Sequence, residues 1–177
     1  MSISRGVHTH SNTPHDTEDF GWELACARPA DDTSFAVVYL TGQLGAGKTT
    51  FARGFIRALG VTEPVRSPTY TLVELYPAGA LTVAHIDLYR LKSPLELETL
   101  GLREWARDGC VWLLEWPEKG AGRLPLADIV VAFAVGPAGH EIVAHAYSSL
   151  GKNWLAQLTG EEGPPGRPAS AGLKRTG

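Results

Sequence analysis

The sequence is poor in the residues that mark disulfide-rich, zinc-binding and nucleic-acid-binding proteins. Its 177 residues include only two cysteines, Cys26 and Cys110, whose spacing indicates neither a disulfide framework nor a metal knuckle. We expect both to be reduced thiols in a reducing compartment. The formal net charge is −3, and no long run of Lys and Arg supplies the basic stripe of a protein that binds RNA or DNA by itself.

Long apolar stretches are also absent. The N-terminal segment MSISRGVHTHSNTPHD lacks the hydrophobic core of a secretory signal, and the runs FAVVYL and IVVAFAV are too short to span a membrane. These absences predict a cytoplasmic protein. The polar residues 1–13 are predicted to form a flexible tail, and residues 160–177, rich in Gly and Pro, a disordered one. The remaining residues 14–159 suit one folded domain.

The apolar pattern between the tails predicts both strands and helices. Residues 36–41 form a continuous apolar run, which is typical of a strand buried on both faces. A helix is predicted over residues 48–59, where Gly60 ends it, and an earlier helix is predicted to begin with Thr17 as its N-cap. The segment SPLELETLGLREWARDG is predicted to be helical with a break near Gly101, and SLGKNWLAQL to form a short closing helix.

Two pairs of alternating segments predict strand pairs, the first either a β-hairpin or two neighbouring strands and the second a β-hairpin. TYTLVELY and LTVAHIDLY flank the turn PAGA, and DIVVAFAV and HEIVAHAY flank the turn GPAG. The apolar run VWLLE predicts a second buried strand. The sequence shows no internal repeat and no sign of a second domain.

Residues 42–49, GQLGAGKT, match the phosphate-binding pattern G-x-x-x-x-G-K-[ST] at every required position. The glycines Gly42, Gly45 and Gly47 let the backbone turn and present its N–H groups to an anion. Lys48 is placed to reach the β- and γ-phosphates of a nucleotide, and the Thr49 hydroxyl to bind Mg²⁺. The predicted strand before the loop and the helix after it, whose positive end faces the phosphates, provide the context that the motif requires.

Two carboxylates that follow apolar strands are candidates for the acid that a P-loop needs to hold Mg²⁺ or to orient water. Glu115 ends VWLLE, and Asp87 ends LTVAHID. Either could instead be a surface carboxylate in a salt bridge, and His85 is equally compatible with a polar site and with a core or surface position. The SPT segment at residues 67–69 is either a switch that senses the γ-phosphate or a turn that leads into a strand.

Five motifs occur in the order that one family shows. They are GQLGAGKTTFARG, SPTYTLVELY, HIDLYRL, LELETLG and LEWPEKG, and the match covers about residues 17–158. In this combination the chain resembles the TsaE (YjeE-type) P-loop ATPase family of bacterial tRNA threonylcarbamoyladenosine biosynthesis. SPTYTLV, HIDLYRL and EWPE make the resemblance specific, because many NTPases share the P-loop alone.

The resemblance implies an α/β fold, in which a single P-loop NTPase-type domain has a mixed, mostly parallel central sheet flanked by helices, with β-hairpins. It also implies ATP and Mg²⁺ as cofactors, and an ATPase that is weak by itself. Members of the family act with TsaD and TsaB to sustain turnover of threonylcarbamoyl transfer to the adenosine next to the anticodon of tRNA. The tRNA is expected to meet this chain only indirectly, through the complex.

Roles for individual residues follow from the matching motif positions and are likewise implied by the resemblance. The expected catalytic residues are Lys48, Asp87 and Glu115, and the expected Mg²⁺ ligands are Thr49 and Glu115. The expected nucleotide-binding residues are Gly45, Ala46, Gly47, Lys48, Thr49 and Thr50, with Thr17 near the adenine. Thr69 is expected in the switch-like segment, and Trp116 beside the nucleotide.

Two other functions stay open at the level of the sequence. A small-molecule kinase would use the same loop, but it needs an acceptor pocket and usually a lid with several arginines. The available arginines form no lid-like cluster in the sequence, and they are Arg90, Arg103, Arg107 and Arg123. A nucleotide-dependent binding module, in which hydrolysis is incidental, would share the loop as well.

Overall fold

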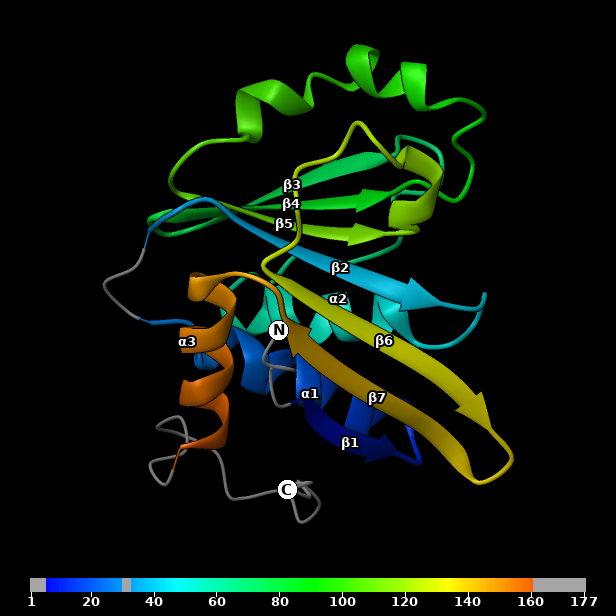
Figure 1. Cartoon of the computed structure of the whole chain (residues 1–177), viewed down its shortest axis with the longest axis vertical. Coiled ribbons are helices and arrows are strands. Elements are labelled where there is room, and N and C mark those ends of the chain that lie inside the picture. The colour runs from blue at the N-terminus through cyan, green and yellow to red at the C-terminus, as the bar shows by residue number, and fades with distance from the viewer. Residues whose placement is uncertain (1–5, 30–32, 161–177) are drawn as a thin grey trace.

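The structure, a computed structural model, describes residues 6–29 and 33–160. Within these residues, seven strands form one sheet in the order β1-β7-β6-β2-β5-β4-β3 (Figure 1). The strands are β1 (Val7–Ser11), β2 (Ala36–Gly42), β3 (Val73–Ala78), β4 (Leu81–Asp87), β5 (Cys110–Glu115), β6 (Ile129–Gly136) and β7 (Gly139–Ala146). The α-helices are α1 (Pro14–Cys26), α2 (Lys48–Ala58) and α3 (Ser149–Thr159).

The centre of the sheet is parallel and its margins are antiparallel. Strands β6, β2, β5 and β4 run parallel, whereas the β3–β4 and β6–β7 pairs are antiparallel hairpins, as the sequence predicted. β2 lies in the middle and is apolar along most of its length because both of its faces are covered. The carboxyl ends of the parallel strands therefore meet at one edge, where α/β sheets bind ligands.

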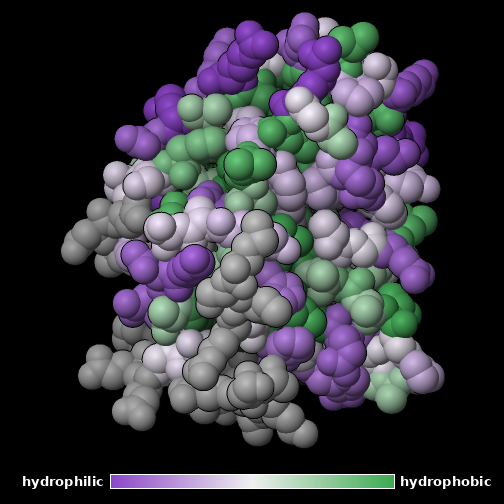
Figure 2. Space-filling model, in the orientation of Figure 1, coloured by the Kyte–Doolittle hydropathy of each residue, from purple (hydrophilic) through white to green (hydrophobic). Residues whose placement is uncertain are grey.

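The two faces of the sheet are covered by different layers. Helices α1, α2 and α3 pack on one face and share its larger core cluster, which includes Leu24, Phe55 and Trp154 (Figure 1). The other face is covered over β4 and β5 by the 3₁₀ segments η1 (Pro94–Leu100), η2 (Leu102–Trp105) and η3 (Pro117–Gly120). Hydrophilic side chains gather on the outside of the 94–105 segment, at the top of Figure 2.

Two glycines allow helices α1 and α2 to cross in close contact. A methyl group on Gly21 would overlap the carbonyl of Phe51, and one on Gly54 would overlap the carbonyl of Glu18. Neither glycine has a positive φ, so conformation is not the reason for glycine at these positions. Glycine inside a helix costs about 1 kcal/mol relative to alanine, so its presence here requires a structural reason. The close approach of the two helix backbones is that reason.

The prediction of a flexible tail over residues 1–13 was wrong for Val7–Ser11. This segment is strand β1, which pairs antiparallel with β7, and Val7 and Ser11 are buried against the helical layer. The residues at the two ends of the chain, 1–5 and 161–177, lie outside the described residues, and with them most of the predicted C-terminal tail.

The predicted N-cap of the first helix was also wrong. Thr13 is the N-cap, and it forms a capping box in which its hydroxyl accepts from the Asp16 N–H while the Asp16 carboxylate accepts from the Thr13 N–H. Pro14 occupies the first helical position, where its missing N–H costs nothing. Thr17 therefore lies inside the first turns of α1 and is buried.

The segment at residues 94–105 is helical with a break at Gly101, as predicted, but its helices are of the 3₁₀ type. Gly101 has φ 66°, which glycine adopts readily and which separates η1 from η2. None of the helices that the structure describes has the length and apolar composition needed to cross a bilayer.

Candidate functional site

The loop between β2 and α2 forms the base of the site. Gly45 has φ 77° and Gly47, the N-cap of α2, has φ 101°, and both values strain any residue that has a side chain. The first backbone N–H groups of α2 have no partner inside the helix and lie at its positive end. The loop therefore presents an anion site built from the backbone.

Lys48 crosses this loop from the first turn of α2. Its ammonium Nζ donates to the carbonyl oxygens of Gly42 and Gln43, both at 2.7 Å. It also lies 4.1 Å from the centroid of the Trp116 ring. The residue is only 4% exposed, and burial lowers the pKa of its ammonium, while the carboxylates of Glu115 and Asp87 act in the opposite direction. A buried cation is thus held beside the helix terminus.

Glu115 meets the P-loop helix from the neighbouring strand. The Thr49 hydroxyl donates to the Glu115 carboxylate, at 2.9 Å from Oε1 and 3.2 Å from Oε2. β5 pairs with β2 so that Glu115 lies opposite Leu40, near the start of the loop. The carboxylate is 3% exposed, so the alternative of a surface salt bridge does not apply to it. His85 lies beneath it, with Nε2 at 2.9 Å from Oε1.

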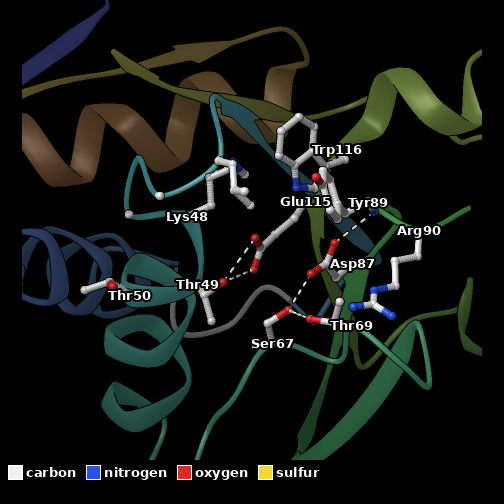
Figure 3. A pocket seen from close by; sticks show the side chains of 13 residues that line it. Lys48, Thr49, Thr50, Ser67, Thr69, Asp87, Tyr89, Arg90, Glu115 and Trp116 are labelled. Atoms are coloured by element: carbon white, nitrogen blue, oxygen red, sulfur yellow. Dashed lines mark hydrogen bonds between the residues drawn. The ribbon is translucent and has the colours of Figure 1, made fainter. Parts of the chain in front are cut away.

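Asp87 is the neighbour of Glu115 on β4, because the parallel register places the two residues opposite each other. Its carboxylate accepts from the Ser67 hydroxyl and, at 2.9 Å, from the Tyr89 backbone N–H. The hydroxyls of Ser67 and Thr69 are 2.7 Å apart. Asp87 is therefore buried and connected to the SPT segment, and the loop that carries this segment lies beside the P-loop (Figure 3).

These side chains surround a cavity of about 430 Å³ (Figure 3). The cavity is lined by Leu44, Gly45, Gly47, Lys48, Thr49, Thr50, Ser67, Thr69, Asp87, Tyr89, Arg90, Glu115 and Trp116. Most of the residues that the sequence singled out thus come together around one space.

Two of the expected nucleotide-binding residues do not line this cavity. Ala46 is buried, and its carbonyl oxygen lies 3.0 Å from Nδ1 of His140. Thr17 is buried behind the loop, where its hydroxyl lies 2.7 Å from that of Ser11. A Cβ on Gly47 would meet the Thr17 methyl group at 3.3 Å. In this structure Thr17 supports the loop from behind.

Three residues that line the cavity were not assigned to it from the sequence. Leu44 lies in the loop itself, and Tyr89 and Arg90 come shortly after β4, separated from it by Leu88. The Tyr89 and Trp116 ring centroids are 5.0 Å apart, and the Arg90 guanidinium lies 4.5 Å from the Tyr70 ring centroid. The place of Tyr89 and Arg90 just after a strand could have predicted that they line the site, since residues that follow a parallel strand lie at the carboxyl edge of the sheet.

The donors of the cavity suit a magnesium–nucleotide complex. Thr49 and Glu115 offer a hydroxyl and a carboxylate, the oxygen ligands that Mg²⁺ prefers. Among the described residues, no group of three or more His, Cys, Asp and Glu side chains could hold a metal ion. A pair of protein oxygens suits Mg²⁺, which in nucleotide sites takes its remaining ligands from phosphates and water.

Comparison with known proteins identifies the family. The model of the family "Threonylcarbamoyl adenosine biosynthesis protein TsaE" matches residues 11–140. The chain belongs to the TsaE family. The resemblance inferred from the five sequence motifs is thereby confirmed.

Similar proteins support both the family and the fold. The tRNA threonylcarbamoyladenosine biosynthesis protein TsaE of Haemophilus influenzae is 47% identical over 123 residues, which cover 70% of this chain and 78% of that protein. Its Bacillus subtilis counterpart is 44% identical over 101 residues, which cover 57% of this chain and 60% of that protein. The crystal structure of Bacillus subtilis YdiB superposes with a TM-score of 0.72 at 27% identity, covering 90% of this chain and 97% of that one. The predicted α/β domain, with a mixed sheet flanked by helices, is confirmed.

Proposed function

We propose that this member of the TsaE family is an ATPase that binds ATP with Mg²⁺ and serves tRNA threonylcarbamoyladenosine biosynthesis. The observation that carries the proposal is the contact of the Thr49 hydroxyl with the Glu115 carboxylate at 2.9 Å, beside Lys48 and the N-terminus of α2. A cation, a metal-ligand pair and a backbone anion site in one cavity are what the phosphates of a nucleotide require.

The residues of the loop bind and orient the nucleotide. The free backbone N–H groups at the start of α2 would face the phosphates, and Lys48 would contact the β- and γ-phosphates. Thr49 and Glu115 would hold Mg²⁺, which when bound neutralises charge that develops on the phosphate oxygens. The rings of Tyr89 and Trp116, which are in tilted contact, form a wall of the cavity and would shield one side of a bound nucleotide from water.

Asp87 is proposed to orient the attacking water. Its carboxylate lines the cavity, and its hydrogen bonds to Ser67 and to the Tyr89 N–H fix its direction. An oriented carboxylate oxygen accepts a hydrogen bond from water and so aligns the water for attack. Because Ser67 also contacts Thr69, the same carboxylate connects the site with the switch-like segment.

Partner proteins are proposed to supply the RNA contacts. The net charge of −3 does not favour direct binding of tRNA by this chain. We propose that TsaD and TsaB hold the tRNA and that this chain meets it only through their complex, in the cytoplasm, to sustain turnover of the threonylcarbamoyl transfer. The family assignment supports this setting.

The first test is the rate of ATP hydrolysis by the purified chain, alone and with TsaB and TsaD added. Strong stimulation by the pair would support a partner-dependent ATPase. A low rate that active partners leave unchanged would contradict it, and a screen of small acceptors for phosphoryl transfer would follow. The Glu115→Ala variant then tests the need for hydrolysis, at ATP concentrations at which the variant is shown to bind ATP and its partners: tRNA modification should stop after one round. Modification at the full rate would refute the proposal.

A further inference from the structure

One buried polar contact at the site has no role in the function proposed above. His85 lies on β4 and is fully buried, and its Nε2 is 2.9 Å from Oε1 of Glu115, which is 3% exposed. The sequence left open whether His85 belongs to a polar site or to the core. The structure places it in both, because it is enclosed by the core and contacts a residue of the cavity.

The sheet register explains why His85 reaches this carboxylate. Strands β4 and β5 are parallel, with His85 opposite Leu113 and Asp87 opposite Glu115. His85 is therefore the diagonal neighbour of Glu115 on the sheet face that the α-helices cover, and diagonal neighbours lie within reach of long side chains. If β4 paired with a strand other than β5, or if the β4–β5 register shifted by one residue, the His85 ring would no longer lie beside the Glu115 carboxylate.

The donor and acceptor groups of the two side chains decide which of them donates in the contact between His85 and Glu115. A carboxylate that holds a metal ion is an acceptor, so Nε2 of His85 donates to Glu115. Nδ1 of His85 is buried and has no hydrogen-bond partner among the described residues.

We propose that His85 is a positioning residue that fixes the Glu115 carboxylate in the orientation needed for Mg²⁺. The other hydrogen-bond donor to this carboxylate among the described residues is Thr49, which is itself an expected ligand and would direct its oxygen to a bound metal. The bond from His85 then keeps Oε1 in place and the carboxylate aimed at the cavity. This inference rests on the proposed Mg²⁺–nucleotide site.

The role is tested by the effect of Mg²⁺ on nucleotide affinity, rather than by activity. We would titrate ADP by calorimetry with Mg²⁺ and again with EDTA, and take the ratio of the two affinities. His85→Leu removes the donor at similar size, and the ratio should fall by about 10- to 100-fold, as for other partners of metal ligands. ADP affinity in EDTA should stay within about twofold.

Two further variants separate positioning from packing. His85→Gln places an amide N–H near the position of Nε2 and should keep most of the Mg²⁺ effect. Val83→Ala is the matched control, because Val83 is fully buried two residues earlier on the same face of β4 and makes no contact with the cavity. It should lower the melting temperature and leave the affinity ratio unchanged.

Three results would overturn the role of His85. These are an unchanged ratio in folded His85→Leu, an equal loss in His85→Gln and His85→Leu, or an equal loss in Val83→Ala. If His85→Leu does not fold, His85→Asn replaces it. The amide of Asn is one methylene too short to reach Glu115, so this variant should lose the Mg²⁺ effect that His85→Gln keeps. Equal affinity ratios in His85→Asn and His85→Gln would refute the role. A wild-type chain whose ADP affinity ignores Mg²⁺ would refute the proposed site itself.

Discussion

Replacement of Lys48 by methionine tests the phosphate site most directly, because methionine keeps most of the side-chain stem and removes the ammonium. Lys48 is 4% exposed, and its ammonium is held at 2.7 Å from two loop carbonyl oxygens, so it is already in place before a nucleotide arrives. A hydrogen bond to a charged group contributes about 1.5–3 kcal/mol. Since about 1.4 kcal/mol changes affinity tenfold, ATP affinity should fall by about 10- to 150-fold.

The fold should tolerate this change. The carbonyls of Gly42 and Gln43 lose a donor, but Gly42 is half-buried and Gln43 is exposed, so water can replace it. The lost ammonium is itself disfavoured by burial, which lowers the pKa of Lys48. These effects oppose each other, so we expect the free energy of unfolding to change by no more than about 1 kcal/mol. The lower affinity would then report the missing phosphate contact.

The assay is isothermal calorimetry of ATP binding, with circular dichroism to confirm the fold. Lys152→Met is the matched control, because Lys152 is exposed on α3 and the substitution makes the same change in net charge. The control should bind ATP like the wild type. Undiminished binding by Lys48→Met would refute the phosphate role, and an equal loss in both variants would assign the effect to net charge alone.

Three further predictions concern the metal, the helix crossing and the first strand. Thr49→Val should abolish most of the gain in nucleotide affinity that Mg²⁺ provides, while nucleotide binding in EDTA persists. If calorimetry shows the full gain in the variant, Thr49 is not a Mg²⁺ ligand. Gly54→Ala should lower the free energy of unfolding by about 1–3 kcal/mol in urea, because the new methyl group meets the Glu18 carbonyl; an unchanged value would contradict the close crossing. The hydrogen bond to Glu141 raises the pKa of His10 above its usual value of 6.5, so the pair stabilises the fold below that pH and less as pH rises through the raised pKa. Glu141→Gln should therefore lower the melting temperature more at about pH 5 than at about pH 8.5, and equal shifts would disprove the link.

The phosphate loop could be predicted because its signals are local. The strand that enters the loop, the glycines that turn it and the helix that leaves it are consecutive, so one stretch of sequence contains the whole element. Glu115 could be proposed for the same reason, since an apolar run leads directly to it. These predictions required no knowledge of which strands are neighbours.

The first strand could not be predicted from local pattern. Val7–Ser11 is polar and shows little alternation, and it is a strand because its backbone pairs with β7, more than 100 residues away in the sequence. The start of α1 is different, because Thr13, Pro14 and Asp16 are readable signals of an N-terminus. The choice of Thr17 as the N-cap overlooked a capping box that begins four residues earlier.

The strand order decides what the two carboxylates can do. Because β5 lies between β2 and β4, Glu115 faces the Thr49 hydroxyl on one side and His85 on the other. Asp87, one strand further from the loop, faces Ser67. The two acids therefore have different partners although both follow similar apolar runs, and sequence reasoning could not divide their roles because it does not give the strand order. The order thereby sets two groups of hydrogen-bonded side chains side by side, one that joins Glu115 to the phosphate loop and one that joins Asp87 to the SPT segment.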